Sequence, residues 1–271
     1  MSYRNKAKRA ARNKTASLVR KEKSAAPLKL FAVCALAFIL NSGPVEDAKS
    51  IYGENSPSAG ISSAVDADQP QQVFTEVKAS WNVVDITQKG GRNERLAQWI
   101  GISNMNRNVR PGERVIKTDL IQAGALCDEN GCRLFYELLP LQALSYRFTV
   151  NGGDRINAQI SKLSGGKDLW LIRLNDQTKN ITINEKVRYH SSQEAVQWIL
   201  ETPTAVREGN ISLSELPRFN EAAFFDCSSK TDSPAPIKFY KLEITRNWRA
   251  MTKTETRPGN DNSIIIRRLR R

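Results

Sequence analysis

The feature that most constrains the fold is a series of short segments in which apolar residues occupy every second position. In residues 168–174, for example, Trp170, Ile172 and Leu174 share one side of an extended chain. Turn residues such as Gly and Asn separate these segments, and no helical period is visible. The pattern predicts an all-β chain built as an antiparallel sandwich or barrel. Similar segments cover residues 114–122, 133–140, 145–150, 154–160, 180–189 and 237–244.

The positive charge of the chain is concentrated at its ends. Residues 1–29 contain ten Lys or Arg and one Glu, and the last five residues contain four Arg, so these two ends account for the whole net charge of +13. A nucleic-acid-binding domain would spread its basic residues over the folded surface. We therefore expect no nucleic-acid partner, whereas the basic termini could associate with a membrane surface.

An apolar run of eleven residues, LFAVCALAFIL at 30–40, follows the basic start. It is shorter than the roughly 20 residues of a membrane span and is typical of a secretory signal. We expect an exported protein, secreted or periplasmic. The alternative is an uncleaved membrane anchor through residues 30–40, which the positive-inside rule favours. A transit peptide and a buried helix behind a basic tail are weaker alternatives.

Three regions follow from these patterns. Residues 1–48 form a disordered basic start with its signal or anchor segment. Residues 49–75 are rich in Ser, Pro, Gly, Gln and Asp without periodicity and are predicted to be a linker or propeptide. Residues 76–271 form the β-sandwich domain, which we expect to be a monomer.

Two cysteines flank a predicted hairpin turn. In the segment CDENGC, Asn130 and Gly131 suit the positive dihedral angles of such a turn, so the strands could bring Cys127 and Cys132 close enough for a disulfide. This pairing leaves Cys227 outside it.

The single histidine, His190, restricts the possible chemistry. The chain has no CxxC motif and no second histidine, so we expect no metal site. It also lacks a GxSxG motif for a serine nucleophile, and we interpret His190 as a surface residue.

Two polar residues follow apolar residues at positions that packing alone does not require. Glu201 ends the apolar segment 195–201, where a solvated strand end is the ordinary interpretation. Gln122 stands before a predicted turn at Gly124. Their segments are far apart in the sequence, and spacing alone does not bring the two side chains together.

The order of several short motifs resembles the glutamic peptidase (eqolisin) family over residues 79–229. The specificity lies in the series rather than in any single motif. The motifs are ASWN at 79–82, QWIGIS at 98–103, LIQAG at 120–124, FYELLP at 135–140, GGDRI at 152–156, AVQWILETP at 195–203 and FFDCS at 224–228.

The resemblance implies a concanavalin A-like sandwich of two curved sheets and an acid-acting endopeptidase that cleaves protein or peptide substrates without a cofactor. Gln122 and Glu201 fall on the family's catalytic pair, whereas Trp99 and Glu137 match residues that line or support its cleft. Glu201 would activate water and protonate the leaving amine, which an ordinary glutamate pKa of about 4.3 suits in acid. Gln122 would stabilise the oxyanion.

Some positions depart from the family pattern. Seventeen residues separate Trp81 from Trp99, fewer than the family usually has, and Ser103 stands where family members have an aspartate. Phe135 replaces an aromatic residue of another type near the glutamate of FYELLP. The alternative function is therefore a catalytically inactive sandwich that binds peptide or glycan in the cell envelope.

Overall fold

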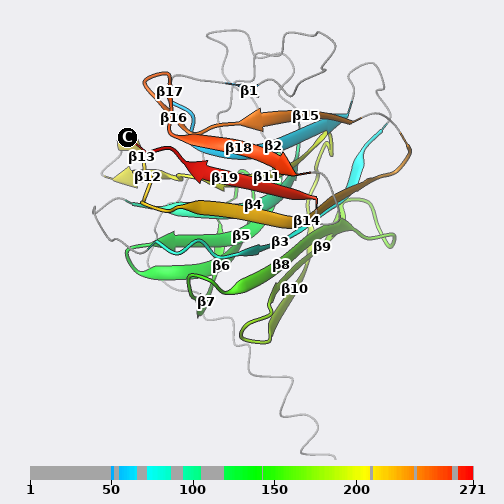
Figure 1. Ribbon diagram of the computed structural model, residues 1–271. Coiled ribbons are helices and arrows are strands. Elements are labelled where there is room, and N and C mark those ends of the chain that lie inside the picture. The colour runs from blue at the N-terminus through cyan, green and yellow to red at the C-terminus, as the bar shows by residue number, and fades with distance from the viewer. Residues whose placement is uncertain are drawn as a thin grey trace, which may run out of the picture.

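The computed structural model contains β-strands and turns, and no helix, within the residues that it describes (Figure 1). No helix in this part of the chain could therefore cross a membrane. The expected signal or anchor segment at 30–40 lies outside the described residues. These are 50–51, 55–65, 72–86, 94–104, 119–141, 143–207, 210–234, 237–257 and 262–270.

Two large sheets form a sandwich, which confirms the predicted fold class. All neighbouring strands in these sheets are antiparallel except β1 and β15, which are parallel. The eight-stranded sheet has the order β1 (Ser50–Ile51), β15 (Ile237–Leu242), β2 (Ser58–Val65), β11 (Ala195–Glu201), β4 (Leu96–Ser103), β5 (Leu120–Asp128), β6 (Gly131–Leu138) and β7 (Leu144–Val150). The seven-stranded sheet has the order β10 (Ile181–Arg188), β9 (Leu169–Asp176), β8 (Arg155–Lys162), β3 (Phe74–Asn82), β14 (Glu221–Thr231), β19 (Ser263–Arg268) and β18 (Thr252–Arg257).

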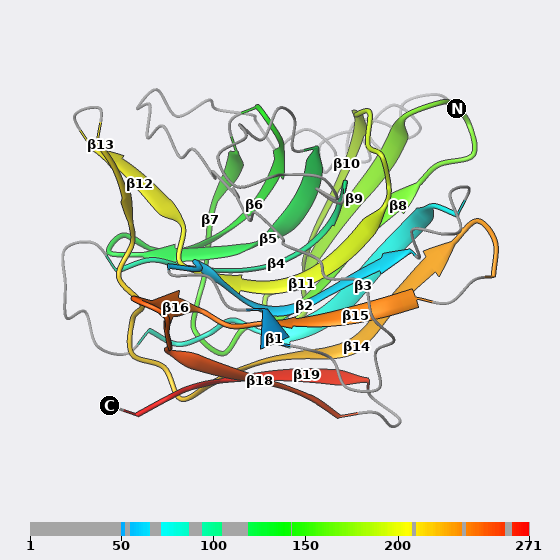
Figure 2. The ribbon, with the colours of Figure 1, turned by 90° about the horizontal axis from the view of Figure 1, so that it is seen from above.

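Two short hairpins accompany the sandwich. One joins β12 (Thr204–Arg207) to β13 (Asn210–Leu213), and the other joins β16 (Thr245–Arg246) to β17 (Arg249–Ala250). Figure 2 shows that the strands around β4, β5 and β6 are strongly curved.

The core between the sheets follows from the alternation seen in the sequence. Trp170, Ile172 and Leu174 on β9 are buried in it, and Trp198 and Leu200 on β11 approach from the other sheet. Burying one face of each sheet removes a large apolar area from water, which is the main stabilising term of such a sandwich.

The domain begins earlier than the sequence predicted. β2, at residues 58–65, lies inside the eight-stranded sheet between β11 and β15, so the prediction of a linker is wrong for these residues. The small residues of β2 show no clear amphipathic period in the sequence. The close approach of β11 requires a glycine at position 60. A Cβ on Gly60 would lie 2.1 Å from the carbonyl oxygen of Trp198.

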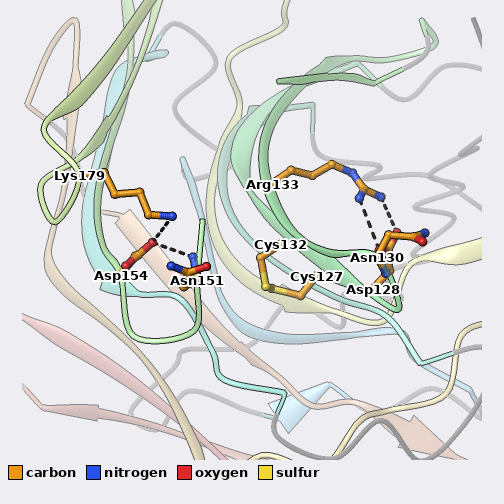
Figure 3. The surroundings of a disulfide bond; sticks show 8 residues. All are labelled: Cys127, Asp128, Asn130, Cys132, Arg133, Asn151, Asp154 and Lys179. Carbon is orange, nitrogen blue, oxygen red and sulfur yellow. Dashed lines mark hydrogen bonds and ion pairs between the residues drawn. A yellow bond between two sulfur atoms is a disulfide. The ribbon is translucent and has the colours of Figure 1, made fainter. Parts of the chain in front are cut away.

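The predicted hairpin between Cys127 and Cys132 is confirmed, and the two residues form a disulfide (Figure 3). The turn differs in detail, because Asp128 pairs with Gly131 and only Gly131 has a positive φ, of 105°. The Asp128 carboxylate accepts a hydrogen bond from the backbone N–H of Asn130 at 2.8 Å, which stabilises this turn.

Candidate active site

Two strands of the eight-stranded sheet, β5 and β11, carry the two predicted catalytic residues on one face, with β4 between them. Gln122 lies between Ile121 and Ala123, both in the core, so its side chain points away from the seven-stranded sheet. Glu201 follows Leu200 of the core and points to that same outer side. The alternation of the strands therefore places the two side chains on the same face, in different rows of the register.

Trp99 on β4 is the hydrogen-bond partner of Glu201. The register places Trp99 opposite Ile199, and its indole Nε1–H donates to Oε2 of Glu201 at 2.9 Å. The indole thereby fixes the position of one carboxylate oxygen. Trp99 was expected to line or support a cleft, and the structure places it as a support for the glutamate.

Glu137 on β6 has the equivalent relation to Gln122. The two residues are direct partners in the register, and Nε2 of Gln122 donates to Oε2 of Glu137 at 2.5 Å. The other side-chain oxygen of each residue, Oε1, has no hydrogen-bond partner among the described residues. The amide of Gln122 therefore retains an unused acceptor next to a carboxyl group.

All four side chains are buried, and this burial changes the acidity of Glu137. Glu201 is 4% exposed, and Trp99, Gln122 and Glu137 are each 2% exposed. Burial raises the pKa of Glu137 to about 7, opposed by the hydrogen bond from Gln122 and reinforced by the negative charge of Glu201. Glu137 is thus protonated in acid, whereas an ordinary carboxyl group is ionised above about pH 5.

The predicted turn at Gly124 is wrong, because β5 continues to Asp128 and Gln122 lies inside a strand. Gly124 is needed for a close approach between strands. It pairs with Trp99, and an added Cβ would lie 2.2 Å from the carbonyl oxygen of Gln98 and 2.6 Å from Cβ of Trp99. The glycine leaves the space that the backbone of β4 and Cβ of Trp99 occupy.

A small apolar cluster that includes Trp99 lies on the outer face beside Gln122, Glu137 and Glu201. It is separate from the core and explains why β4 and β5 are buried on both sides. It includes Phe135, one of the departures from the family pattern. Its buried members are Ala97, Trp99, Leu120, Leu126, Phe135, Ile199 and Leu242.

Tyr189, which sequence reasoning did not single out, braces the two strands that carry Gln122 and Glu137. Its hydroxyl accepts from the backbone N–H of Leu120 and donates to the carbonyl of Leu139, both at 2.7 Å. These residues lie two positions before Gln122 and two positions after Glu137. Tyr189 follows β10 of the seven-stranded sheet, so its hydroxyl links that sheet to the eight-stranded one. Nothing in the local sequence around the tyrosine predicts this link.

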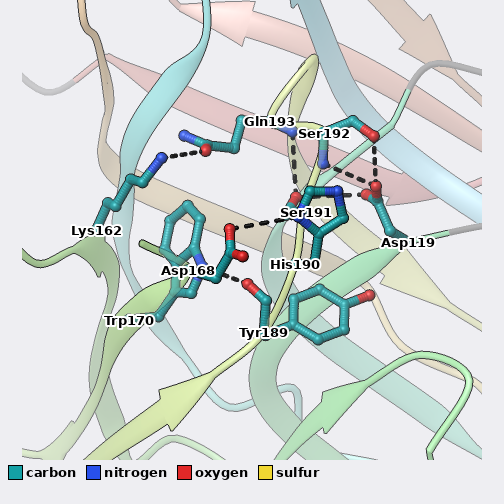
Figure 4. Close-up of polar contacts among 9 residues, drawn as sticks. All are labelled: Asp119, Lys162, Asp168, Trp170, Tyr189, His190, Ser191, Ser192 and Gln193. Atoms are coloured by element: carbon teal, nitrogen blue, oxygen red, sulfur yellow. Dashed lines mark hydrogen bonds and ion pairs between the residues drawn. The ribbon is translucent and has the colours of Figure 1, made fainter. Parts of the chain in front are cut away.

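Figure 4 shows the segment around this tyrosine. Asp119 accepts hydrogen bonds from the backbone N–H and the hydroxyl of Ser192, at 2.8 and 2.6 Å. His190 lies outside the site, with its side chain 78% exposed and its Nδ1 3.4 Å from Asp168. The interpretation of His190 as a surface residue is confirmed. Within the described ranges, no cluster of His, Cys, Asp and Glu is suited to hold a metal ion.

Comparison with solved structures finds the same fold in glutamic peptidases. The structure of scytalido-glutamic peptidase with a transition state analog inhibitor matches with a TM-score of 0.62 and 16% identity, over 79% of this chain and 98% of that one. SCP-B, described as a member of the eqolisin family in complex with the tripeptide Ala-Ile-His, matches with a TM-score of 0.60 and 15% identity, over the same shares.

Comparison with curated protein sequences yields no significant match. The model of the Peptidase A4 family, by contrast, matches residues 59–267. This range begins with β2 and ends inside β19, so it includes both sheets and all four residues of the site. The chain therefore belongs to the Peptidase A4 family.

Proposed function

We propose that this protein is an acid-acting endopeptidase that hydrolyses peptide bonds with Glu201 and Gln122. Its family supports a peptidase with a protein or peptide substrate. The observation that carries the finer proposal is that both side chains lie on one sheet face and that each has its own buried partner. Such partners hold catalytic groups in fixed orientations. This preorganisation lowers the activation barrier relative to the same reaction in water.

Glu201 would act as the general base and then as the general acid. Its carboxylate takes a proton from a water molecule as the oxygen of that water attacks the peptide carbonyl carbon. The same proton then passes to the leaving nitrogen as the C–N bond breaks. The hydrogen bond from Trp99 would hold Oε2 of this carboxylate in a fixed position during the reaction.

Gln122 would stabilise the oxyanion of the tetrahedral intermediate with its amide N–H, and Glu137 would control when that donor is available. Below a pH of about 7 the carboxyl group of Glu137 is protonated and can donate to Oε1 of Gln122. A rotation of the amide then turns Nε2 away from Glu137 and toward the substrate. When Glu137 is ionised, its carboxylate keeps accepting the hydrogen bond from Nε2 of Gln122. It also places a second negative charge near Glu201. This arrangement favours activity in acid.

An exported protein would meet such conditions, and the disulfide between Cys127 and Cys132 fits an oxidising compartment outside the cytosol. Export through the basic and apolar start of the chain belongs to the same proposal.

One observation favours the alternative, a binding module without turnover. The four side chains expose 4% of their surface or less, so a substrate carbonyl reaches Glu201 only if local structure opens. Activity measurements separate the two functions.

The first test compares the protein with Glu201→Gln on an acid-denatured protein substrate. The assay runs from about pH 3 to about pH 8, a range that includes the titration of carboxyl groups. The substitution retains the shape and the acceptor for Trp99 but removes the base, so we expect a loss of about 10²- to 10⁴-fold in kcat. Glu129→Gln, in the exposed turn after β5, serves as the matched control and should leave the rate unchanged. A well-folded parent that cleaves nothing would support the binding module.

A second variant tests the role of Glu137. In Glu137→Gln the new amide can donate to Oε1 of Gln122 at every pH, so the fall in rate as pH rises through about 7 should disappear. A variant that retains this fall would show that another group causes it.

A further inference from the structure

The β16–β17 hairpin presents a tryptophan where stability alone would not place one. Its two turn residues, Asn247 and Trp248, have φ angles of 48° and 62°. Glycine is the usual residue at the second position of such a turn, because a side chain in the left-handed region is strained. Trp248 is nevertheless there, and it is 67% exposed. Strain and exposure together indicate a function for this side chain.

The base of the hairpin is rigid, which fixes the direction of its tip. The guanidinium of Arg246 donates to the carbonyl oxygens of Ser56 at 3.2 Å and Ser214 at 3.1 Å, and to Oγ1 of Thr202 at 3.0 Å. Ser56 lies just before β2, Thr202 follows β11 and Ser214 follows β13, so these contacts join the hairpin to the ends of three other strands. The backbone N–H of the turn residue Asn247 also donates to Oδ1 of Asn55 at 3.1 Å.

Exposed basic and apolar residues lie on the hairpin and on the C-terminal segment that is hydrogen-bonded to the residue after it. The backbone N–H of Leu269 donates to the carbonyl of Met251 at 2.9 Å, which brings the C-terminal end of the chain close to β17. Figures 1 and 2 both show this end of the chain near the hairpin. Leu269, Arg249 and Arg270 are exposed. We call Trp248, Arg249, Leu269 and Arg270 the Trp248 patch.

We propose that the Trp248 patch docks the protein on an anionic lipid bilayer. Tryptophan has a preferred position at the boundary between lipid and water, where its ring is buried and its N–H stays hydrated. Arg249 and Arg270 would bind the negative headgroups around it, and Leu269 adds apolar area. An acidic polypeptide would use the two arginines but would have less need for a projecting tryptophan and leucine.

The position of the start of the domain supports a membrane as the occupant. β1 pairs with the end of β15, and Asn55 contacts the hairpin turn itself. The chain that enters β1 comes from the apolar run at 30–40, only nine residues before Ser50. Nine residues reach at most about 30 Å. A bilayer that holds the apolar run would therefore lie within reach of the Trp248 patch.

The intrinsic fluorescence of Trp248 can test this proposal. Of the five tryptophans of the protein, the other four, Trp81, Trp99, Trp170 and Trp198, are between 0% and 3% exposed. Quenching of fluorescence by acrylamide therefore reports mainly on Trp248. With the full chain, we expect phosphatidylglycerol-containing vesicles to shift the emission to shorter wavelength and to protect it from acrylamide. Pure phosphatidylcholine vesicles should do so far less, and high salt should reverse the effect.

Variants then separate the Trp248 patch from the basic N-terminal segment. Trp248→Gly relieves the strained turn, so it should fold at least as well as the parent, yet bind these vesicles about ten-fold more weakly in sedimentation. Arg249→Gln with Arg270→Gln should also weaken binding. Leu141→Gln is the matched control, because Leu141 is an exposed apolar residue in the turn after β6. It should bind like the parent.

Three outcomes would overturn the proposal. The first is unchanged tryptophan emission in the presence of anionic vesicles. The second is a folded Trp248→Gly variant that binds vesicles as tightly as the parent does. The third is an equal or larger shift with polyglutamate in place of vesicles, which would assign the Trp248 patch to acidic polypeptides. None of these measurements depends on the proposed peptidase activity.

Discussion

The hydrogen bond between Trp99 and Glu201 is the contact that a single substitution tests most directly. Trp99→Phe removes the indole donor but leaves an aromatic ring in the apolar cluster around it. A hydrogen bond to a charged group contributes about 1.5–3 kcal/mol. If that energy serves to orient the carboxylate, kcat should fall by about 10- to 100-fold while KM changes little.

The control for this prediction is a tryptophan with an indole hydrogen bond elsewhere. Trp198, a core residue, donates its Nε1–H to the backbone carbonyl of Lys78 at 3.1 Å. Trp198→Phe should lower the melting temperature without a comparable effect on kcat. An equal loss of activity in both variants would mean that Trp99 acts only through general stability.

At the scale of the strands, Gly124 determines how closely β4 and β5 approach around the site. In Gly124→Ala the new methyl group would overlap the backbone of Gln98 and the side chain of Trp99, so the strands must separate. Overpacking of this kind costs about 1–3 kcal/mol. We expect a lower denaturation midpoint in urea, and a loss of activity as Trp99 moves away from Glu201.

Gly165→Ala provides the comparison for this prediction. Gly165 lies in the turn before β9, and an added Cβ would meet no atom within 4 Å. Its midpoint should stay within error of the parent. If Gly124→Ala is equally harmless, the close contact at Gly124 is not a constraint on the site.

The elements also show what the sequence can predict and why. Strands such as β8 and β9 have one buried face, so their alternation predicts both the strand and its core residues. β2 consists mostly of small residues and has one large core side chain, Ile61, and its position in the sheet depends on the hydrogen bonds that β11 and β15 supply on both of its edges. That context is set by residues more than a hundred positions away.

In the site, too, the sequence predicts the residues but not the contacts between them. The motifs predicted Gln122, Glu201, Trp99 and Glu137 by resemblance, but the contacts between them depend on strand register. Burial on both faces of β5, and with it the high pKa of Glu137, arises from the second apolar cluster on the outer face. Tyr189 was missed because its two partners are backbone groups, which have no sequence signature.

For the whole molecule, the buried carboxyl group of Glu137 makes stability depend on pH. Its pKa is about 7 in the folded protein against an ordinary value of 4.5. Below about pH 4.5 the group is protonated in both the folded and the unfolded chain, so its contribution is constant. Between about 4.5 and 7 only the folded protein retains the proton, and the free energy of unfolding must fall as pH rises. The size of this fall is roughly 3 kcal/mol.

Urea denaturation of the parent and of Glu137→Gln at a series of pH values isolates this contribution. Other groups also titrate, since burial raises the pKa of Glu243. Burial acts to raise the pKa of Glu76 as well, but the contacts of Glu76 with lysines and Gln159 outweigh this effect and lower it. Those effects are common to both proteins and cancel in the difference. The parent should therefore lose stability relative to Glu137→Gln between about pH 4.5 and pH 7, and the difference should level off above that range. A difference that stays constant with pH would mean that folding does not raise the pKa of Glu137. The group would then be mostly ionised between about pH 4.5 and pH 7, and the protonated donor proposed for that range would be excluded.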